Sequence, residues 1–324
     1  MLNPKKFRMA FKRYCRNFDN ETRLQDIDND YEEIKDEIIN IVEENNIDKD
    51  HILLIDLDTI SLNYLSKWKK DVLINGENKV EQLKHVQMVV FYQCIVQELY
   101  KTRYPNMMPE YTFKEVITAL IHFTMFGWER EENILYDFIV NHINENRLDI
   151  NELNKHIWFL LELYLQYRHK TICGTNEKLY IVIKENLHKL KLQYKLIPEE
   201  LGIYREVLES WTTCNVKELE ELINKMSLFH SILASEIGQS FEFGDFKYGF
   251  YPFEILFLIY VRKRTELPVP KEFDDLLMNT PEAKMVIEDA EPYPQWDDLL
   301  LLIDGFYRKN YPEYIPNKYG ELFK

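Results

Sequence analysis

The sequence predicts an all-α protein of antiparallel helix pairs packed into one compact helical body, with no strict repeat. Three observations predict this fold: few glycines, apolar residues recurring at helical spacing, and capping signals where helices would start. Glycine makes up nine of 324 residues, about 3% against a usual ~7%. Doubly wound and barrel folds use glycine at many turns, so a chain this poor in glycine favours helices.

Capping residues mark the predicted helix starts. Three pairs have capping-box spacing, namely Thr112 with Glu115, Asp149 with Glu152, and Asn215 with Glu218. Prolines at a first helical position predict two more starts, at Pro198 and, after Thr280, at Pro281. Apolar periodicity predicts further helices over residues 22–45, 78–103, 129–145, 176–193, 250–264 and 296–310. The sequence does not decide which secondary structure residues 48–66 form.

The chain is about twice the usual length of one domain. The proline cluster from Pro105 to Pro109 is the best boundary between an N-terminal helical part, 1–109, and a C-terminal helical part, 110–324. No low-complexity linker marks this boundary, so we expect the two parts to be packed together.

Charge favours a basic partner. The chain has 40 basic and 55 acidic residues, a net charge of −15, which disfavours nucleic acid and anionic membranes as partners. The four cysteines, Cys15, Cys94, Cys173 and Cys214, lack metal or redox spacing and indicate free thiols in a reducing cytoplasm. No signal peptide is recognisable, and the apolar runs are too short to span a bilayer.

Two motifs suggest metal chemistry, and both are better explained as helix. The run from Leu53 to Thr59 resembles the start of a haloacid-dehalogenase-type phosphatase, in which Asp56 and Asp58 would act beside magnesium. The residues that follow have a helical pattern, which disfavours this hypothesis. Asp26, Asp28, Asp30 and Glu37 match positions of a calcium loop, but Tyr31 stands where that loop needs glycine. An acidic, solvated helix is the favoured interpretation.

No catalytic group emerges from the remaining motifs, so we expect no enzyme activity, cofactor or metal. His122, His156 and His230 fall in amphipathic segments and are expected to be hydrogen-bonded structural residues. The basic N-terminal segment carries Lys5, Lys6, Arg8, Lys12, Arg13 and Arg16. A membrane or nucleic-acid contact is one interpretation of it. The favoured one is a first helix whose cations meet the acidic run from Asp26 to Glu37.

The C-terminal third combines acids with aromatics, a pattern typical of surfaces that anchor a basic partner. An ordinary solvated face is the alternative. The candidate partner-binding residues are Asp274, Asp275, Glu288, Asp289, Glu291, Trp296, Asp297 and Asp298.

The same third resembles a known family. The run from Lys247 to Leu256 leads into Tyr260-Val261-Arg262, then Leu276 to Pro281, and is preceded by Tyr204 to Trp211 and by Phe229-His230. This order is similar to the PoNi-like immunity proteins of bacterial polymorphic toxins, over about residues 200–310. These are packing motifs: Pro252 would start a helix, and Glu254 would cap it or pair with Arg262. The resemblance implies a helical protein that neutralises a nuclease toxin.

We therefore expect a cytoplasmic immunity protein that binds a cognate toxin with a basic surface and blocks its active site. The alternative is a non-enzymatic helical scaffold or regulator that binds a peptide in an aromatic groove around Trp158, Tyr164 and Tyr167. The phosphatase through Asp56 and Asp58 ranks third.

Overall fold

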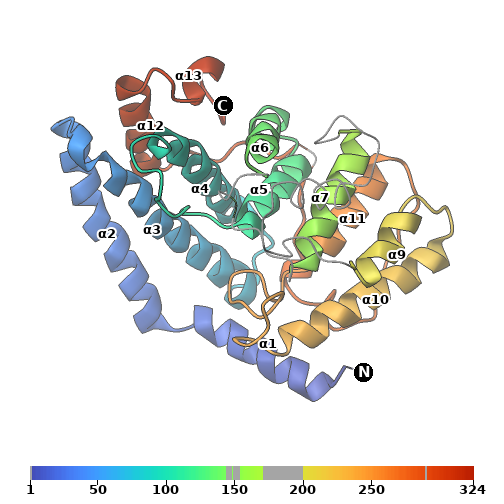
Figure 1. Ribbon diagram of the computed structural model, residues 1–324. Coiled ribbons are helices and arrows are strands. Elements are labelled where there is room, and N and C mark those ends of the chain that lie inside the picture. Colours follow the sequence, from blue (N-terminus) through green and yellow to red (C-terminus); the bar gives the residue numbers. More distant parts are fainter. Residues whose placement is uncertain (1, 144–147, 149–153, 171–199, 289) are drawn as a thin grey trace. The chain divides into compact units, whose positions relative to one another are not determined.

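The computed structural model describes residues 2–143, 148, 154–170, 200–288 and 290–324. These residues form twelve α-helices and no strand, which confirms the predicted all-α fold (Figure 1). Three predictions lie outside the described residues: the capping pair Asp149 and Glu152, the start at Pro198, and the helix over 176–193.

The chain forms two compact units, each made from two separate stretches of sequence. Unit 1 comprises residues 1–17 and 150–285, and unit 2 comprises 18–149 and 286–324. This division differs from the one at residue 109, because Pro105 and Pro109 both lie inside unit 2. There they belong to a loop between two helices of the same unit, and Tyr100 and Tyr111 on either side of that loop are buried.

Unit 2 is a succession of helices that each pack against the next: α2 (Glu21–Glu43), α3 (Asp50–Lys69), α4 (Glu81–Gln97), α5 (Phe113–Phe126) and α6 (Glu129–His142). A π-helical turn, Lys70–Ile74, extends α3. The first pair is antiparallel, because Asn63 near the end of α3 donates to Asp28 near the start of α2 at 3.0 Å. Gly127 ends α5 with φ +73, a left-handed conformation that glycine adopts without steric cost.

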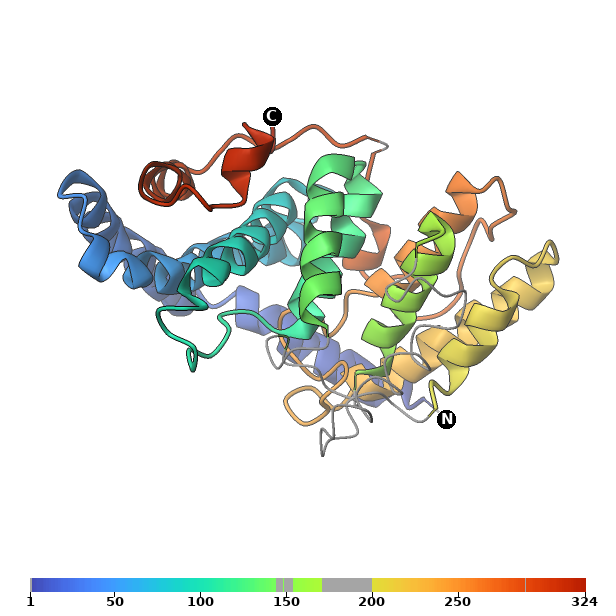
Figure 2. The ribbon, with the colours of Figure 1, turned by 45° about the horizontal axis from the view of Figure 1, so that its top comes forward.

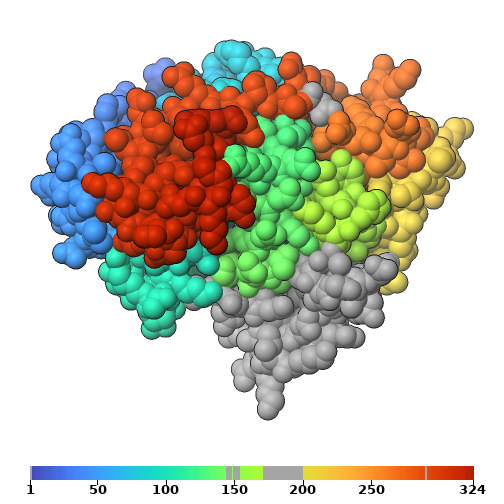
Figure 3. Space-filling model, turned by 90° about the horizontal axis from the view of Figure 1, so that it is seen from above, coloured from blue at the N-terminus to red at the C-terminus, as the bar shows by residue number. Residues whose placement is uncertain are grey.

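The C-terminal segment completes unit 2. Helix α12 (Asp298–Asn310) packs against α2, α3 and α4, and the short α13 (Pro316–Tyr319) follows it. Arg130 of α6 donates to the carbonyl of Glu321 at 2.8 Å. In Figure 3 this segment, in red, covers the surface between the first helices of unit 2, in blue, and α6, in green.

Unit 1 contains α1 (Pro4–Phe18, whose last residue belongs to unit 2), α7 (Lys155–Arg168), α9 (Ile203–Ser210), α10 (Val216–Ala234) and α11 (Phe253–Arg264). Helices α7, α9, α10 and α11 contact one another and lie side by side in Figures 1 and 2. Helix α1 buries Phe7, Ala10 and Tyr14, spaced three and four residues apart as an amphipathic helix requires. Its phenyl and phenol rings contact Phe250.

The capping predictions have mixed outcomes. Thr112 and Glu115 form the complete capping box, as predicted. Asn215 caps α10, but the carboxylate of Glu218 accepts from the hydroxyl of Thr213 instead of closing the box. The helix predicted at Thr280 and Pro281 is wrong, because only a single 3₁₀ turn, Glu282–Lys284, follows.

The predicted partnership between Glu254 and Arg262 is also wrong. Glu254 Oε1 lies 2.7 Å from His230 Nδ1, with both side chains fully buried. Arg262 is buried as well and donates to backbone carbonyls of Trp211, Thr213 and Pro268. The guanidinium therefore ties two loops to α11, a role that helical spacing gives no means of detecting.

Candidate functional site

The predicted partner-binding residues are divided between the two units. Asp274 and Asp275 belong to unit 1 and the others to unit 2, while Asp289 lies outside the described residues. Asp274, Glu288 and Asp298 are exposed and remain available to a partner. The four others hold the protein itself together.

Glu291 is a buried ion-pair partner. Its Oε2 lies 2.9 Å from Lys84 Nζ, and both side chains are almost fully buried. Its Oε1 accepts the backbone N–H of Glu288 at 2.6 Å, and Lys84 also donates to the carbonyl of Pro292 at 2.9 Å. A buried charge needs such partners to offset its lost hydration, so this carboxylate stabilises unit 2.

Asp297 is also committed to the fold. Its Oδ1 caps α12 by accepting from Leu299 and Leu300, and its Oδ2 accepts the hydroxyls of Tyr31 at 2.5 Å and Tyr64 at 2.7 Å. Burial, with the adjacent carboxylate, raises the pKa of both tyrosines. One side chain thereby joins α2, α3 and α12.

The remaining two candidates are half-buried. Trp296 donates its indole N–H to the carbonyl of Phe323 at 3.3 Å and contacts the ring of Tyr92. Asp275 accepts from the hydroxyl of Ser227 and from the backbone N–H of Met278.

The exposed negative charge of unit 2 gathers instead on α2. Ile27, Ile38 and Ile41 face the core, while every carboxylate of the helix is exposed: Glu21, Asp26, Asp28, Asp30, Glu32, Glu33, Asp36, Glu37 and Glu43. Only Arg23 and Lys35 oppose them within the helix. The excess of nine acidic over two basic residues in one amphipathic helix is the sequence signal that could have located this surface. We call these nine exposed carboxylates the α2 acidic face.

The two metal hypotheses fail on backbone geometry. Asp26, Asp28, Asp30 and Glu37 lie along a continuous helix and cannot wrap a calcium ion as a loop does. Leu53 to Thr59 lies within α3, not at the end of a strand. Among the residues that the structure describes, no group of three His, Cys, Asp or Glu side chains is placed to hold a metal ion.

The histidines are structural, as predicted. His156 Nδ1 lies 2.9 Å from Glu242, His230 contacts Glu254 and the carbonyl of Gly249, and His122 contacts the carbonyl of Thr118 at 2.7 Å. All three are fully buried. Burial, helped by the charge of Lys69, lowers the pKa of His122 to about 4.

The rings expected to line a peptide groove are largely buried. Trp158 and Tyr164 are buried in unit 1, and Tyr167 is half-buried against the ring of Tyr260. Trp158 and Tyr164 are therefore not exposed to a peptide.

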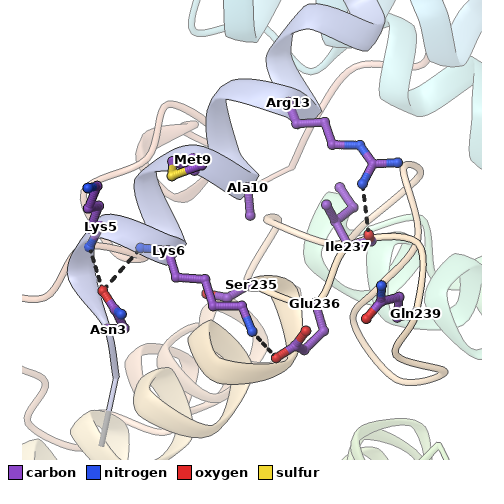
Figure 4. Close-up of a pocket in the computed structure, with 10 residues that line it drawn as sticks. All are labelled: Asn3, Lys5, Lys6, Met9, Ala10, Arg13, Ser235, Glu236, Ile237 and Gln239. Atoms are coloured by element: carbon purple, nitrogen blue, oxygen red, sulfur yellow. Dashed lines mark hydrogen bonds and ion pairs between the residues drawn. The ribbon is translucent and has the colours of Figure 1, made fainter.

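The basic N-terminal segment lines a cavity of about 480 Å³ in unit 1 (Figure 4). Lys6 forms an ion pair with Glu236 across the cavity, and Arg13 donates to the carbonyl of Ile237 at 3.5 Å. The predicted acidic partners, Asp26 to Glu37, belong to unit 2. Two of the cations are thus engaged within unit 1, which leaves the cavity a weak site for an anion.

No family model, curated protein or solved structure matches this chain. Within the part of the chain that the structure describes, no helix is both long and apolar enough to cross a membrane.

Proposed function

We propose that this chain is a cytoplasmic immunity protein, which binds a cognate bacterial toxin through a basic surface of that toxin and blocks its active site. The α2 acidic face is the observation that carries the proposal. Its nine exposed carboxylates stand on a helix anchored at Ile27, Ile38 and Ile41. A fixed array of like charges steers a partner of opposite charge and sets its orientation.

A nuclease toxin suits this face best. Its nucleic-acid groove has to be basic, because lysines and arginines neutralise phosphates there. An acidic helix competes for the same groove. The resemblance of residues 200–310 to PoNi-like immunity proteins points to the same class of partner, and the net charge of −15 agrees with it.

The first experiment is rescue from killing. Each protein encoded beside this gene is expressed alone and together with this chain, and growth and complex formation on a sizing column are recorded. Survival together with a stable complex is the expected result. Killing that co-expression leaves unrelieved, with the two proteins eluting separately, refutes the proposal.

The second experiment tests the face itself. Asp26→Asn, Asp30→Asn and Glu33→Gln together remove three charges from exposed positions. The matched control removes three exposed charges elsewhere, through Glu220→Gln, Glu272→Gln and Glu313→Gln. We expect the α2 variant to associate at least about tenfold more slowly at low salt, and the control to behave as wild type. Equal loss in both variants would mean that only net charge matters.

A further inference from the structure

Helix α1 presents a row of basic side chains to solvent. The row follows the helix at spacings of three, four and four residues, and its members are all exposed: Lys5, Arg8, Lys12 and Arg16. Residues three and four positions apart are neighbours on one side of a helix. The aromatic side of α1 is buried in unit 1 and holds the helix in place. We call the four exposed residues the α1 basic row.

The α1 basic row keeps its charge. Helix α1 contains no acidic residue. Lys6, which pairs with Glu236, and Arg13, which donates to the carbonyl of Ile237, do not belong to the row. Within the part of the chain that the structure describes, Lys6 is the cation of α1 that takes part in an ion pair. The four charges of the row are therefore available to an anionic surface from outside.

A row of opposite charge lies on α2, within the α2 acidic face. It follows that helix at spacings of four, three and four residues, and its members are all exposed: Asp26, Asp30, Glu33 and Glu37. Lys35, the basic residue within this stretch, lies 3.5 Å from Glu32, which is outside the row. We call these four carboxylates the α2 acidic row. This chain thus carries both a basic and an acidic row on consecutive helices.

The two rows match in length and in spacing. Both extend over eleven residue steps, from position 5 to 16 and from position 26 to 37, which is about 16 Å along a helix. Neighbouring charges are about 4.5–6 Å apart along the axis in both rows. Helices pack with their axes about 8–10 Å apart, a distance that lysine and arginine side chains cross easily. Four cations can therefore face four carboxylates, with no like charge in either row.

The net charge of −15 does not prevent two copies of this chain from meeting through these rows. At physiological salt, charges farther apart than about 8 Å are largely screened from each other. The facing rows of a complex lie closer than this, whereas most other charges of the two copies lie farther apart. Screening therefore weakens the general repulsion between copies more than it weakens the attraction between the rows.

We propose that this chain associates with a second copy of itself, with the α1 basic row of one copy against the α2 acidic row of the other. The contact is reversible and sensitive to salt, because exposed ion pairs are individually weak. It does not depend on the proposed function. Since the α2 acidic row is part of the α2 acidic face, a second copy and a basic toxin exclude each other there.

Sedimentation equilibrium of the full chain tests this contact. With rising protein concentration at about 0.1 M salt, the mass should rise above the 39.3 kDa of one copy, and it should return to that value at about 1 M salt, where charges are screened within about 3 Å. Two variants reverse one row each. The first carries Lys5→Glu, Lys12→Glu and Arg16→Glu, and the second carries Asp26→Lys, Asp30→Lys and Glu33→Lys. Each alone should lose at least about tenfold in association constant. A mixture of the two should associate again, because their reversed rows are of opposite sign.

The matched control changes the net charge as much as the first variant, through Lys217→Glu, Lys263→Glu and Lys271→Glu at exposed positions of unit 1. It should associate as wild type does, and circular dichroism confirms that each variant is folded. The inference is overturned if the control loses as much as the first variant, or if the mixture does not associate. It is also overturned if wild type stays at 39.3 kDa, even where its α1 basic row binds single-stranded DNA or phosphatidylglycerol vesicles. No toxin enters these measurements, so the proposed function stands or falls separately.

Discussion

Replacing Asp56 by asparagine should stabilise this protein at alkaline pH, which reverses the usual effect of altering a buried polar residue. Asp56 lies in α3 with only 6% of its surface exposed, and its Oδ2 has no hydrogen-bond partner among the described residues. Burial and, second, the charge of Glu37 raise its pKa to about 7.

The magnitude follows from linkage. The pKa rises from 3.8 in the unfolded chain to about 7 in the folded one, a shift of about three pH units at about 1.4 kcal/mol each, or about 4 kcal/mol at most. Water and salt near the carboxyl group reduce this, so we expect about 1–3 kcal/mol. Because the folded state holds the proton more tightly, stability is lost as pH rises from about 4 to 7. Above pH 7, where Asp56 is charged in the folded state, the protein bears the full free-energy cost of the buried carboxylate.

Urea unfolding of wild type and Asp56→Asn at pH 4.5 and pH 8 measures this difference. The variant should be more stable at pH 8 and nearly equal at pH 4.5. Asp36→Asn, at an exposed position of α2, is the control and should match wild type at both values. A variant that is less stable than wild type at pH 8, or a difference that does not change with pH, would show that Asp56 is not a strained carboxylate.

Three further predictions concern buried polar groups. Arg262→Met should lower the free energy of unfolding by about 3 kcal/mol or more, because the carbonyls bound by the guanidinium lose their donors; urea titration measures it. Wild type should lose up to about 3 kcal/mol of stability as pH falls from 6.5 toward 4, because the unfolded chain takes up a proton on His122 that the folded state excludes. His122→Phe should remove this loss, which thermal midpoints over that pH range measure. Lys84→Met should cost about 3–5 kcal/mol by leaving Glu291 buried without a cation, and adding Glu291→Met should restore most of it; full additivity of the two changes would contradict the ion pair.

The sequence predicted most helices correctly, including α4 and α11, in which most residues are buried. Helix α2 alternates apolar and acidic residues and was predicted at 22–45 against Glu21–Glu43 observed. The stretch 48–66 stayed open because α3 is covered by both α2 and α4. Polar residues of this helix are buried as well, among them Asp56, Asn63 and Ser66. Burial therefore extends beyond the apolar stripe, and the contrast between an apolar and a polar face that marks an amphipathic helix is weak.

The division into units could not be predicted from the sequence. Unit 1 combines the first 17 residues with residues 150–285, so its two stretches are separated by more than a hundred residues. Breaker residues such as Pro105 report where the chain turns locally. Which helices then bury each other is decided by long-range packing, which no local signal encodes.

The candidate site shows the same limit for charged residues. Glu291 and Asp297 are acids among aromatics, as are Glu288 and Asp298, and sequence spacing cannot distinguish them. The structure separates them by their partners: Lys84 supplies a buried cation to Glu291, and two tyrosine hydroxyls converge on Asp297. A carboxylate that is paired inside the protein counts toward the net charge but adds little to the electrostatic potential at the surface that a partner meets.

Net charge therefore describes this protein less well than the placement of its charges. Helix α1 carries six basic residues and no acidic one, whereas α2 carries nine acidic residues and two basic ones. The two helices are consecutive in the sequence, and a sum over them nearly cancels. Interactions between exposed charges fade within about 8 Å at physiological salt, so a partner responds to one helix face and not to the total of −15. A basic partner would then be selected by α2, while α1 repels it.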